Sequence, residues 1–193
     1  MDSANHSDYR TQAVNMVITR ATYKIGKYVT IEVKDFGHDN VEVVLSQSVY
    51  VDTSKYRKGD RPAMKEFTLS LRRWQQLMMR IDDLQMAMTE HIDGKEVHFK
   101  HHLGRNNFVQ VNSGFKVVDI RQFWLPEHTD QVQPTRKGIA LKFDEFDTLI
   151  KLKAEIEQVI PELDQMQPCW MSDDHMNQEE LMNCRECNPN QHC

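Results

Sequence analysis

The feature that most constrains this chain is an internal repeat with an offset of 72 residues. Apolar side chains recur at the same places in both copies, in the pairs Trp74 and Phe146, Leu77 and Leu149, Met78 and Ile150, and Leu84 and Ile156. Within each copy these positions have helical spacing, so each copy is expected to carry a helix with one apolar stripe. The repeat therefore predicts two structurally similar units.

Strand-like segments precede each of the two expected helices. They alternate apolar and polar residues and are separated by short stretches that contain Gly with Asn, Asp or Ser, as hairpin turns do. In the first copy they are residues 25–33, 41–51 and 65–69, and in the second copy 103–111, 115–125 and 137–141. We predict an α+β fold of two tandem repeats, each an antiparallel β-sheet followed by one α-helix.

The repeats suggest a division of the chain into five parts. These are a flexible N-terminus (1–19), repeat one (20–90), a linker (91–102), repeat two (103–163) and an acidic tail with cysteines (164–193). The linker contains His98, His101 and His102, which are expected to be solvated. The alternation of residues 96–99 leaves open an extra strand that leads into repeat two.

Composition narrows the class of protein. Mean hydropathy is −0.65 and no apolar run approaches the length of a membrane-spanning helix, so no membrane association is expected. The N-terminus lacks the features of a secretory signal, and three of the four cysteines lie in the last ten residues, which favours a reducing compartment. No phosphate-binding glycine loop, nucleophile elbow or H-E-x-x-H motif is present, so neither an enzyme nor a cofactor is predicted.

Net charge is unevenly distributed along the chain. The total is −5, but residues 164–193 hold six acidic side chains and one basic one, so the body is close to neutral. Within the body, aromatic and cationic residues occur together on expected strands, and the loop 55–61 (KYRKGDR) adds four more cations and a tyrosine. Aromatic rings that stack bases beside cations that pair with phosphates are typical of proteins that bind unpaired nucleic acid. Core aromatics and a solvated basic face are the alternative explanation.

Two segments resemble a known family. The run VVDIRQFW (117–124), followed by PTRKGIAL (134–141) and an amphipathic helix, is similar to the C-terminal domain of the transcriptional coactivator called positive cofactor four. Residues 23–37 (YKIGKYVTIEVKDFG) resemble the opening strand and the basic-Asp-Phe turn of the same domain. The resemblance implies a curved sheet with one helix per unit, and it implies that the two repeats pair within one chain as a pseudo-dimer.

The resemblance also implies a function and a set of binding residues. Members of the family bind single-stranded DNA, so the implied partners are single-stranded or melted DNA and the transcription machinery, and the implied location is the nucleus. Further self-association of the pseudo-dimer stays open. By motif position, Trp124 would stack a base, and the phosphates would be contacted by Arg121, Arg136 and Lys137. Lys34 and Phe36 would correspond to the family's basic and aromatic residues at the first turn, and either Lys27 or Arg105 to its early basic residue.

Each copy departs from the family pattern in a different place. Copy one has SQSVY (46–50) where copy two has IRQFW, so its equivalent arginine is absent and its aromatic residue would be Tyr50. Copy two has VNSGF (111–115) in place of the basic-Asp-Phe turn. Each repeat would thus keep half of a binding surface, unless one copy has become purely structural.

The tail admits two interpretations. Cys184 and Cys187 form one C-x-x-C pair that Cys169, His175, His192 or Cys193 could complete as a zinc site, but a single pair is weak evidence. We therefore predict no metal and instead a disordered acidic tail with a short helix near 178–181, which would compete with nucleic acid for the basic face.

For the whole chain, a protein-interaction module on the same scaffold and an RNA-binding protein remain the alternatives to single-stranded DNA binding.

Overall fold

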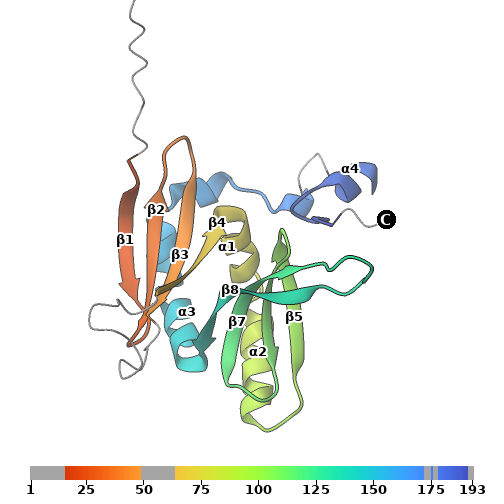
Figure 1. The fold of residues 1–193 in the computed structure, drawn as a ribbon. Helices are drawn as coiled ribbons and strands as arrows, with labels where there is room; N and C mark the ends of the chain where they lie inside the picture. The colour runs from red at the N-terminus through yellow and green to blue at the C-terminus, as the bar shows by residue number, and fades with distance from the viewer. Residues whose placement is uncertain (1–15, 49–63, 172–174, 176–177, 191–193) are drawn as a thin grey trace, which may run out of the picture.

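Two four-stranded antiparallel sheets, each followed by helix, form the body of the protein in a computed structural model (Figure 1). The structure describes residues 16–48, 64–171, 175 and 178–190. The strands lie in chain order within each sheet, β1-β2-β3-β4 and β5-β6-β7-β8. The predicted α+β class with two repeated sheet-and-helix units is confirmed.

The elements of the first repeat are β1 (Ile18–Lys24), β2 (Val29–Asp35), β3 (Val41–Ser48), β4 (Met64–Ser70), α1 (Leu71–Met78) and α2 (Ile81–Ile92). Those of the second repeat are β5 (His98–Gly104), β6 (Asn107–Asn112), β7 (Val117–Trp124), β8 (Gln133–Lys142) and α3 (Phe143–Gln158). The tail adds the short helices η2 (Pro161–Gln165), η3 (Cys169–Met171) and α4 (Gln178–Asn183). Among the helices described, none has the length and apolar character that crossing a membrane requires.

Each sheet has an inner face that is buried and an outer face that is more polar. On β2, Ile31 and Val33 are fully buried, whereas Glu32 and Lys34 between them are partly exposed. On β6, Val109 and Val111 are fully buried and Gln110 between them is not. Because side chains alternate along a strand, this pattern fixes the register of each sheet against the core.

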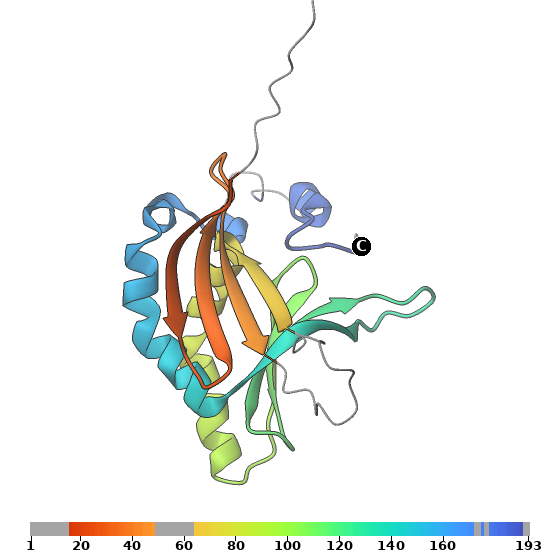
Figure 2. The ribbon, with the colours of Figure 1, turned by 60° about the vertical axis from the view of Figure 1, so that its left-hand side comes forward.

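The helices exchange partners between the two repeats. α2 follows the first sheet in the chain but lies against β6 of the second. α3 contacts β7 and β8 of its own sheet and also runs along β1 of the first sheet (Figures 1 and 2). Hydrogen bonds fasten α3 there: the Tyr23 hydroxyl donates to the Glu155 carbonyl oxygen at 2.9 Å. Arg20 of β1 adds an ion pair to Glu162, just beyond α3, at 2.7 Å. The buried side chains of both repeats consequently form one continuous core.

A local hydrogen bond helps to define where α3 begins. The Glu145 carboxylate, in the first turn, accepts the backbone N–H of Lys142 at 2.9 Å, which satisfies one of the unpaired donors at a helix start. Gly26, in the turn between β1 and β2, packs against the same carboxylate so closely that a Cβ atom there would overlap it. This contact joins the first repeat to the second at the start of the helix.

Three features of the prediction need correction. Each sheet has four strands, because β1 and β5 precede the three strands that were expected. The expected linker 91–102 contains the end of α2 and most of β5, so the boundary at 103 falls inside a strand and the boundary at 19 falls inside β1. The helix of repeat one is also broken near Met79 into α1 and α2. The extra strand that the alternation at 96–99 left open is present as β5, which begins at His98.

Candidate nucleic-acid interface

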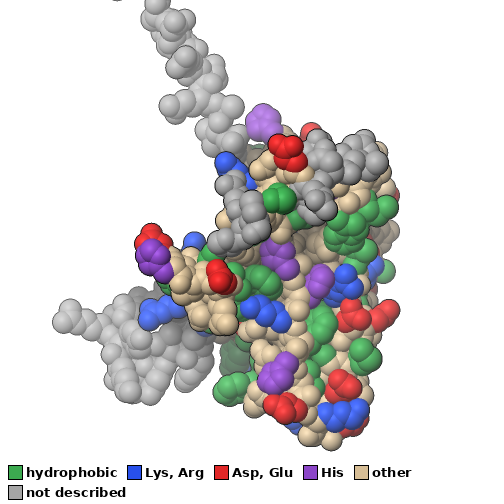
Figure 3. Space-filling view, turned by 90° about the vertical axis from the view of Figure 1, so that its right-hand side faces the viewer, with side chains coloured by type: hydrophobic (Ala, Val, Ile, Leu, Met, Phe, Trp, Pro, Cys, Tyr) green, Lys and Arg blue, Asp and Glu red, His purple; other side chains and the backbone are tan. Residues whose placement is uncertain are grey.

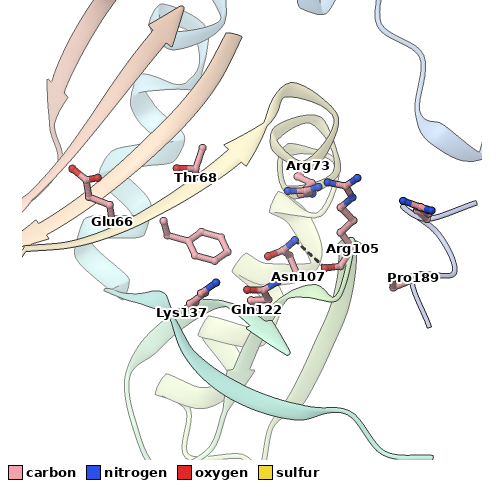
Figure 4. Close-up of a pocket in the computed structure, with 10 residues that line it drawn as sticks. Glu66, Thr68, Arg73, Arg105, Asn107, Gln122, Lys137 and Pro189 are labelled. Atoms are coloured by element: carbon pink, nitrogen blue, oxygen red, sulfur yellow. Dashed lines mark hydrogen bonds between the residues drawn. The ribbon is translucent and has the colours of Figure 1, made fainter. Parts of the chain in front are cut away.

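A groove of about 820 Å³ lies between the two sheets, where β4 runs beside β8 (Figure 4). One wall comes from the first sheet and α1, the opposite wall from the second sheet, and the tail closes one end. Its lining residues are Glu66, Phe67, Thr68, Arg73, Arg105, Asn107, Gln122, Lys137, Arg185 and Pro189. Four of them are cationic and one is acidic, so the groove suits a phosphate backbone.

Arg105 is held at the mouth of the groove by a tight turn between β5 and β6. Arg105 and Asn106 have φ angles of 48° and 58°, in the left-handed region. The buried Asn107 amide supports this strained turn by donating to the Gly104 carbonyl oxygen at 2.8 Å and more weakly to that of Arg105 at 3.3 Å. The Arg105 side chain itself is 59% exposed and available to a ligand.

An acidic residue of the tail lies against two of these arginines. Glu186 accepts hydrogen bonds from Arg73 at 2.8 and 3.3 Å, and its carboxylate lies 3.5 Å from the Nε of Arg105. The Glu186 carbonyl oxygen also accepts the Arg105 N–H at 2.9 Å. Part of the positive charge at the groove is therefore already neutralised from within the chain.

The outer face of the second sheet carries a cluster of aromatic rings and a cation. The Phe108 ring lies 4.9 Å from the Phe123 ring and 4.9 Å from the His102 ring. Lys100 places its ammonium 3.9 Å from the centre of Phe123 and 4.5 Å from that of Phe108. Phe123 is buried beneath Lys100, so a base added to this cluster would meet the partly exposed Phe108 ring beside a positive charge.

Burial sets the charge of the histidines beside this cluster. It is the main reason that the pKa of His102 is lowered, with His101 next to it as a further cause. The pKa of His101 is lowered for the same first reason, and then by Arg80. Because an unperturbed histidine already titrates near 6.5, both rings are neutral at physiological pH and His102 contributes an aromatic surface, not a cation.

Arg121 is on the same outer face but is fully engaged. Its guanidinium donates to both carboxylate oxygens of Asp119 at 2.9 and 3.0 Å, and to the Thr135 carbonyl oxygen at 2.7 Å. The side chain is 24% exposed. The geometry suits an arginine that braces β7 against β8 and presents only its edge to a ligand.

The other residues expected at the site lie in several places. Trp124, which is 52% exposed, ends β7 where the β7–β8 hairpin projects, and Arg136 is exposed on β8 of that hairpin. Lys137 faces the groove with Arg105 (Figure 4). The structure thus brings Arg105 and Lys137 together in one groove.

The first-repeat candidates do not join this surface. Lys27 lies in the β1–β2 turn, where its ammonium is 5.0 Å from the Tyr28 ring, and Phe36 lies in the turn at the other end of β2. Lys34 is paired with Glu32 at 3.0 Å. The loop 55–61 and Tyr50 lie outside the described residues.

Sequence reasoning missed four residues of this surface. They are Arg73, Lys100, Phe123 and Arg185. The extra strand left open at 96–99 stops just before Lys100, and the same alternation continued along β5 places Lys100 on the outer face. The register shift between Arg121 and Phe123 changes which face Phe123 occupies, so simple alternation does not predict its position. Nothing in the sequence indicates that α1 and the tail meet the second sheet.

The face that carries β5 is of mixed charge. Among the residues that the structure describes, Figure 3 shows basic, acidic and histidine side chains interspersed there, without a continuous basic stripe. An extended positive stripe is what a protein that binds duplex DNA without sequence preference would be expected to present. Within the described part of the chain, the groove brings together four cationic side chains that could hold a strand.

Comparison with known proteins relates this surface to one family. Residues 102–152 match the family described as Transcriptional Coactivator p15 (PC4). The matched segment begins in β5, spans β6, β7 and β8, and ends within α3. It confirms the resemblance for the second repeat, whereas the first repeat lies outside it.

One curated relative supports the same conclusion. The RNA polymerase II transcriptional coactivator SUB1 of Saccharomyces cerevisiae is 32% identical over 68 residues, which is 34% of this chain and 23% of the yeast protein. The chain therefore spans about a quarter of the length of that relative. No solved structure matches the chain.

Proposed function

We propose that this protein binds single-stranded or melted DNA and acts as a transcriptional coactivator. The observation that carries the proposal is that the family-matched segment also contains residues of the aromatic cluster and of the groove. The segment that matches the coactivator family supplies Arg105, Phe108, Phe123 and Lys137, which contribute to the aromatic cluster and to the cationic groove. A fold-level likeness alone would not favour binding, but a matching segment that also presents the required chemistry does.

The chemistry favours an unpaired strand. Stacking requires a base whose face is free, and the cluster around Phe108 offers ring faces beside the Lys100 ammonium. Arg105 and Lys137 in the groove would hold the phosphates on either side of stacked bases. In an intact duplex the base faces are covered by their neighbours, so only the electrostatic part of this interaction would remain.

The two sheets would contribute unequally. The outer face of the first sheet carries Glu32, Glu42 and Glu66 at positions that alternate with its buried residues. Negative side chains repel phosphates, so we propose that the strand lies on the second sheet and in the groove. The first repeat would mainly support the second through the shared core.

The proposed role has consequences for location and partners. A coactivator that acts on melted DNA works in the nucleus, beside the transcription machinery, and we propose both for this chain. The proposed activity is binding, for which no catalytic group or cofactor is needed. Binding of RNA in place of DNA is an outcome that the experiment below distinguishes, since rings and cations do not by themselves select the sugar.

The test is fluorescence anisotropy with a labelled single strand, the matched duplex and the same sequence as RNA, each titrated across salt. We expect the single strand of DNA to bind most tightly and the affinity to fall as salt rises. Trp124→Ala should weaken binding by roughly 5- to 150-fold, which corresponds to the loss of about 1–3 kcal/mol per stacked base. The double variant Arg136→Ala/Lys137→Ala should make the salt dependence shallower.

Matched controls separate these effects from general ones. Phe115→Ala removes an exposed ring at the opposite end of β7 from Trp124, and Lys151→Ala removes an exposed cation from α3. Both should bind like the parent protein. Equal affinity for single strand and duplex, or binding that none of the variants changes, would overturn the proposed function in favour of a protein-interaction module.

A further inference from the structure

Four potential metal ligands from the tail meet at one point. The Sγ atoms of Cys169, Cys184 and Cys187 and a ring nitrogen of His175 all lie within 4.8 Å of one another. Cys169 is buried and the other three are partly buried. We propose that these four side chains bind a structural Zn²⁺ ion. This proposal does not depend on the proposed function.

The spacing of the ligand atoms fits a tetrahedral ion. Zinc bonds to sulfur are about 2.3 Å and to imidazole nitrogen about 2.0–2.1 Å, so a tetrahedral site separates two sulfurs by about 3.8 Å and a sulfur and a nitrogen by about 3.5 Å. The Sγ of Cys169 lies 3.5 Å from the Sγ of Cys184 and 3.5 Å from the Nε2 of His175. An ion at the centre of the cluster would need only small shifts of the side chains.

The chemistry of the donors selects the metal. Three thiolates with one imidazole are a common structural zinc set, whereas magnesium and calcium require oxygen ligands that this cluster lacks. Binding would displace a proton from each of the three thiols, and it would leave no ligand position open for a substrate. The ion would therefore serve the fold and not a reaction.

The backbone around the C-x-x-C pair is arranged to support thiolates. The N–H of Cys187 points at the Sγ of Cys184 at 3.5 Å, and the N–H of Asn188 donates to the Cys184 carbonyl oxygen at 2.7 Å. These contacts form a tight turn that places both sulfurs on the same side. Donors aimed at a metal-bound sulfur orient the ligand and disperse its negative charge.

The described residues of the tail bury little apolar surface of their own. Within the described part of 164–190, Cys169 is the only residue whose side chain is buried, and Trp170 and Met171 are largely exposed. A segment with so little apolar burial rarely orders itself without a disulfide or a metal. A disulfide between Cys169 and Cys184 would leave Cys187 and His175 without a role, while a zinc ion uses all four.

The site would fix the tail against the groove. The turn that carries Cys184 and Cys187 presents Glu186 to Arg73 and Arg105, and Asn190 exchanges amide hydrogen bonds with Asn106 at 2.7 and 3.1 Å. Zinc would thus lock an acidic segment beside two arginines of the groove. The described tail contains η3 and α4 in place of the disorder expected from its sequence, and α4 lies where a short helix was predicted.

The test uses the full chain purified under reducing conditions. Elemental analysis should find one zinc per chain, and cobalt substitution should give the visible absorption of a tetrahedral site with thiolate charge-transfer bands. The variant Cys184→Ser/Cys187→Ser should lose the metal, and His175→Gln should weaken metal retention at least tenfold. Cys193→Ser, which changes a cysteine outside the proposed set, should retain the metal fully.

Two further measurements keep the result independent of misfolding. Circular dichroism of the double variant should show the sheets intact, and a chelator added to the parent protein should raise hydrogen exchange in the tail but not in β6 or β7. The proposal is wrong if the parent protein binds no zinc after reconstitution, or if the double variant retains it. Loss of the metal from Cys193→Ser, or a disulfide joining Cys169 and Cys184 in the reduced-purified chain, would overturn it equally.

Discussion

Substitution of Glu186 is the most direct test of the arginines in the groove. Its carboxylate binds Arg73 at 2.8 Å and lies 3.5 Å from Arg105, so it competes with a phosphate for both. In Glu186→Gln the side chain keeps its shape and loses its charge. We expect both arginines to become available to nucleic acid, and binding of a single strand to become tighter and more dependent on salt.

The size of the effect follows from the number of arginines released. On single strands, each phosphate neutralised contributes about −0.7 to the slope of log affinity against log salt, so two arginines should steepen the slope by about 1.4. The electrostatic contribution vanishes at about 1 M salt, so parent and variant should bind equally there. At about 0.15 M salt the steeper slope should make the variant bind roughly tenfold more tightly than the parent protein. An effect of that size is well above the precision of a titration.

The assay is an anisotropy titration of the parent and variant proteins between about 0.05 and 0.5 M salt, the range in which counterion release is measurable. Glu179→Gln is the matched control, because it removes an exposed carboxylate of α4 in the same tail. A Glu186→Gln protein with the parent's slope and affinity would refute the reasoning that Arg73 and Arg105 contact phosphate. If neither protein binds a single strand, the proposed function fails instead, and the zinc site is unaffected.

Three other predictions concern stability. Gly138→Ala should cost about 1–3 kcal/mol in urea unfolding, because a Cβ there would lie 2.8 Å from a backbone oxygen of β7 that cannot move aside. Hydrogen bonds from Arg20 lower the pKa of Asp35 and of Glu162 in the folded protein. The stability that these ion pairs contribute is therefore complete above the pKa values of the unfolded chain, near 4, and is lost as pH falls through the lower pKa values of the folded protein. Arg20→Gln should make the free energy of unfolding less dependent on pH in this acid range. Phe146→Ala should cost about 3–5 kcal/mol, and near- and far-ultraviolet circular dichroism should still report one transition, because both sheets share a core.

The inner half of the fold could be predicted from the sequence. Trp74 and Phe146, the first apolar pair found at the 72-residue offset, are both fully buried, and so are Leu84 and Ile156 further along the helices. Apolar periodicity reports which side chains face the core, because burial is what the pattern encodes. The fold class followed from this periodicity and the turn residues together.

The exchange of helices between sheets could not be predicted in the same way. Nothing local distinguishes a helix that covers its own sheet from one that covers its neighbour's, since both need the same apolar stripe. The groove could not be predicted for a related reason. Arg73 and Lys137 are 64 positions apart in the sequence, and only the packing of α1 beside the second sheet brings them to one cavity. The sequence marks Lys137 of this groove because a family motif contains it, whereas it gives no signal for Arg73, which only tertiary packing places there.

Helix exchange also accounts for the unequal surfaces of the two repeats. Because α3 lies on the first sheet and α2 on the second, removing either sheet would expose the helix of the other repeat. Packing therefore constrains the inner faces of both repeats, whether or not both bind a ligand. The outer faces differ between the repeats: in the first sheet Lys34 pairs with Glu32, whereas the second keeps an aromatic cluster around Phe108. A pseudo-dimer of this kind needs two intact sheets to fold, whereas the proposed binding uses the outer face of only one.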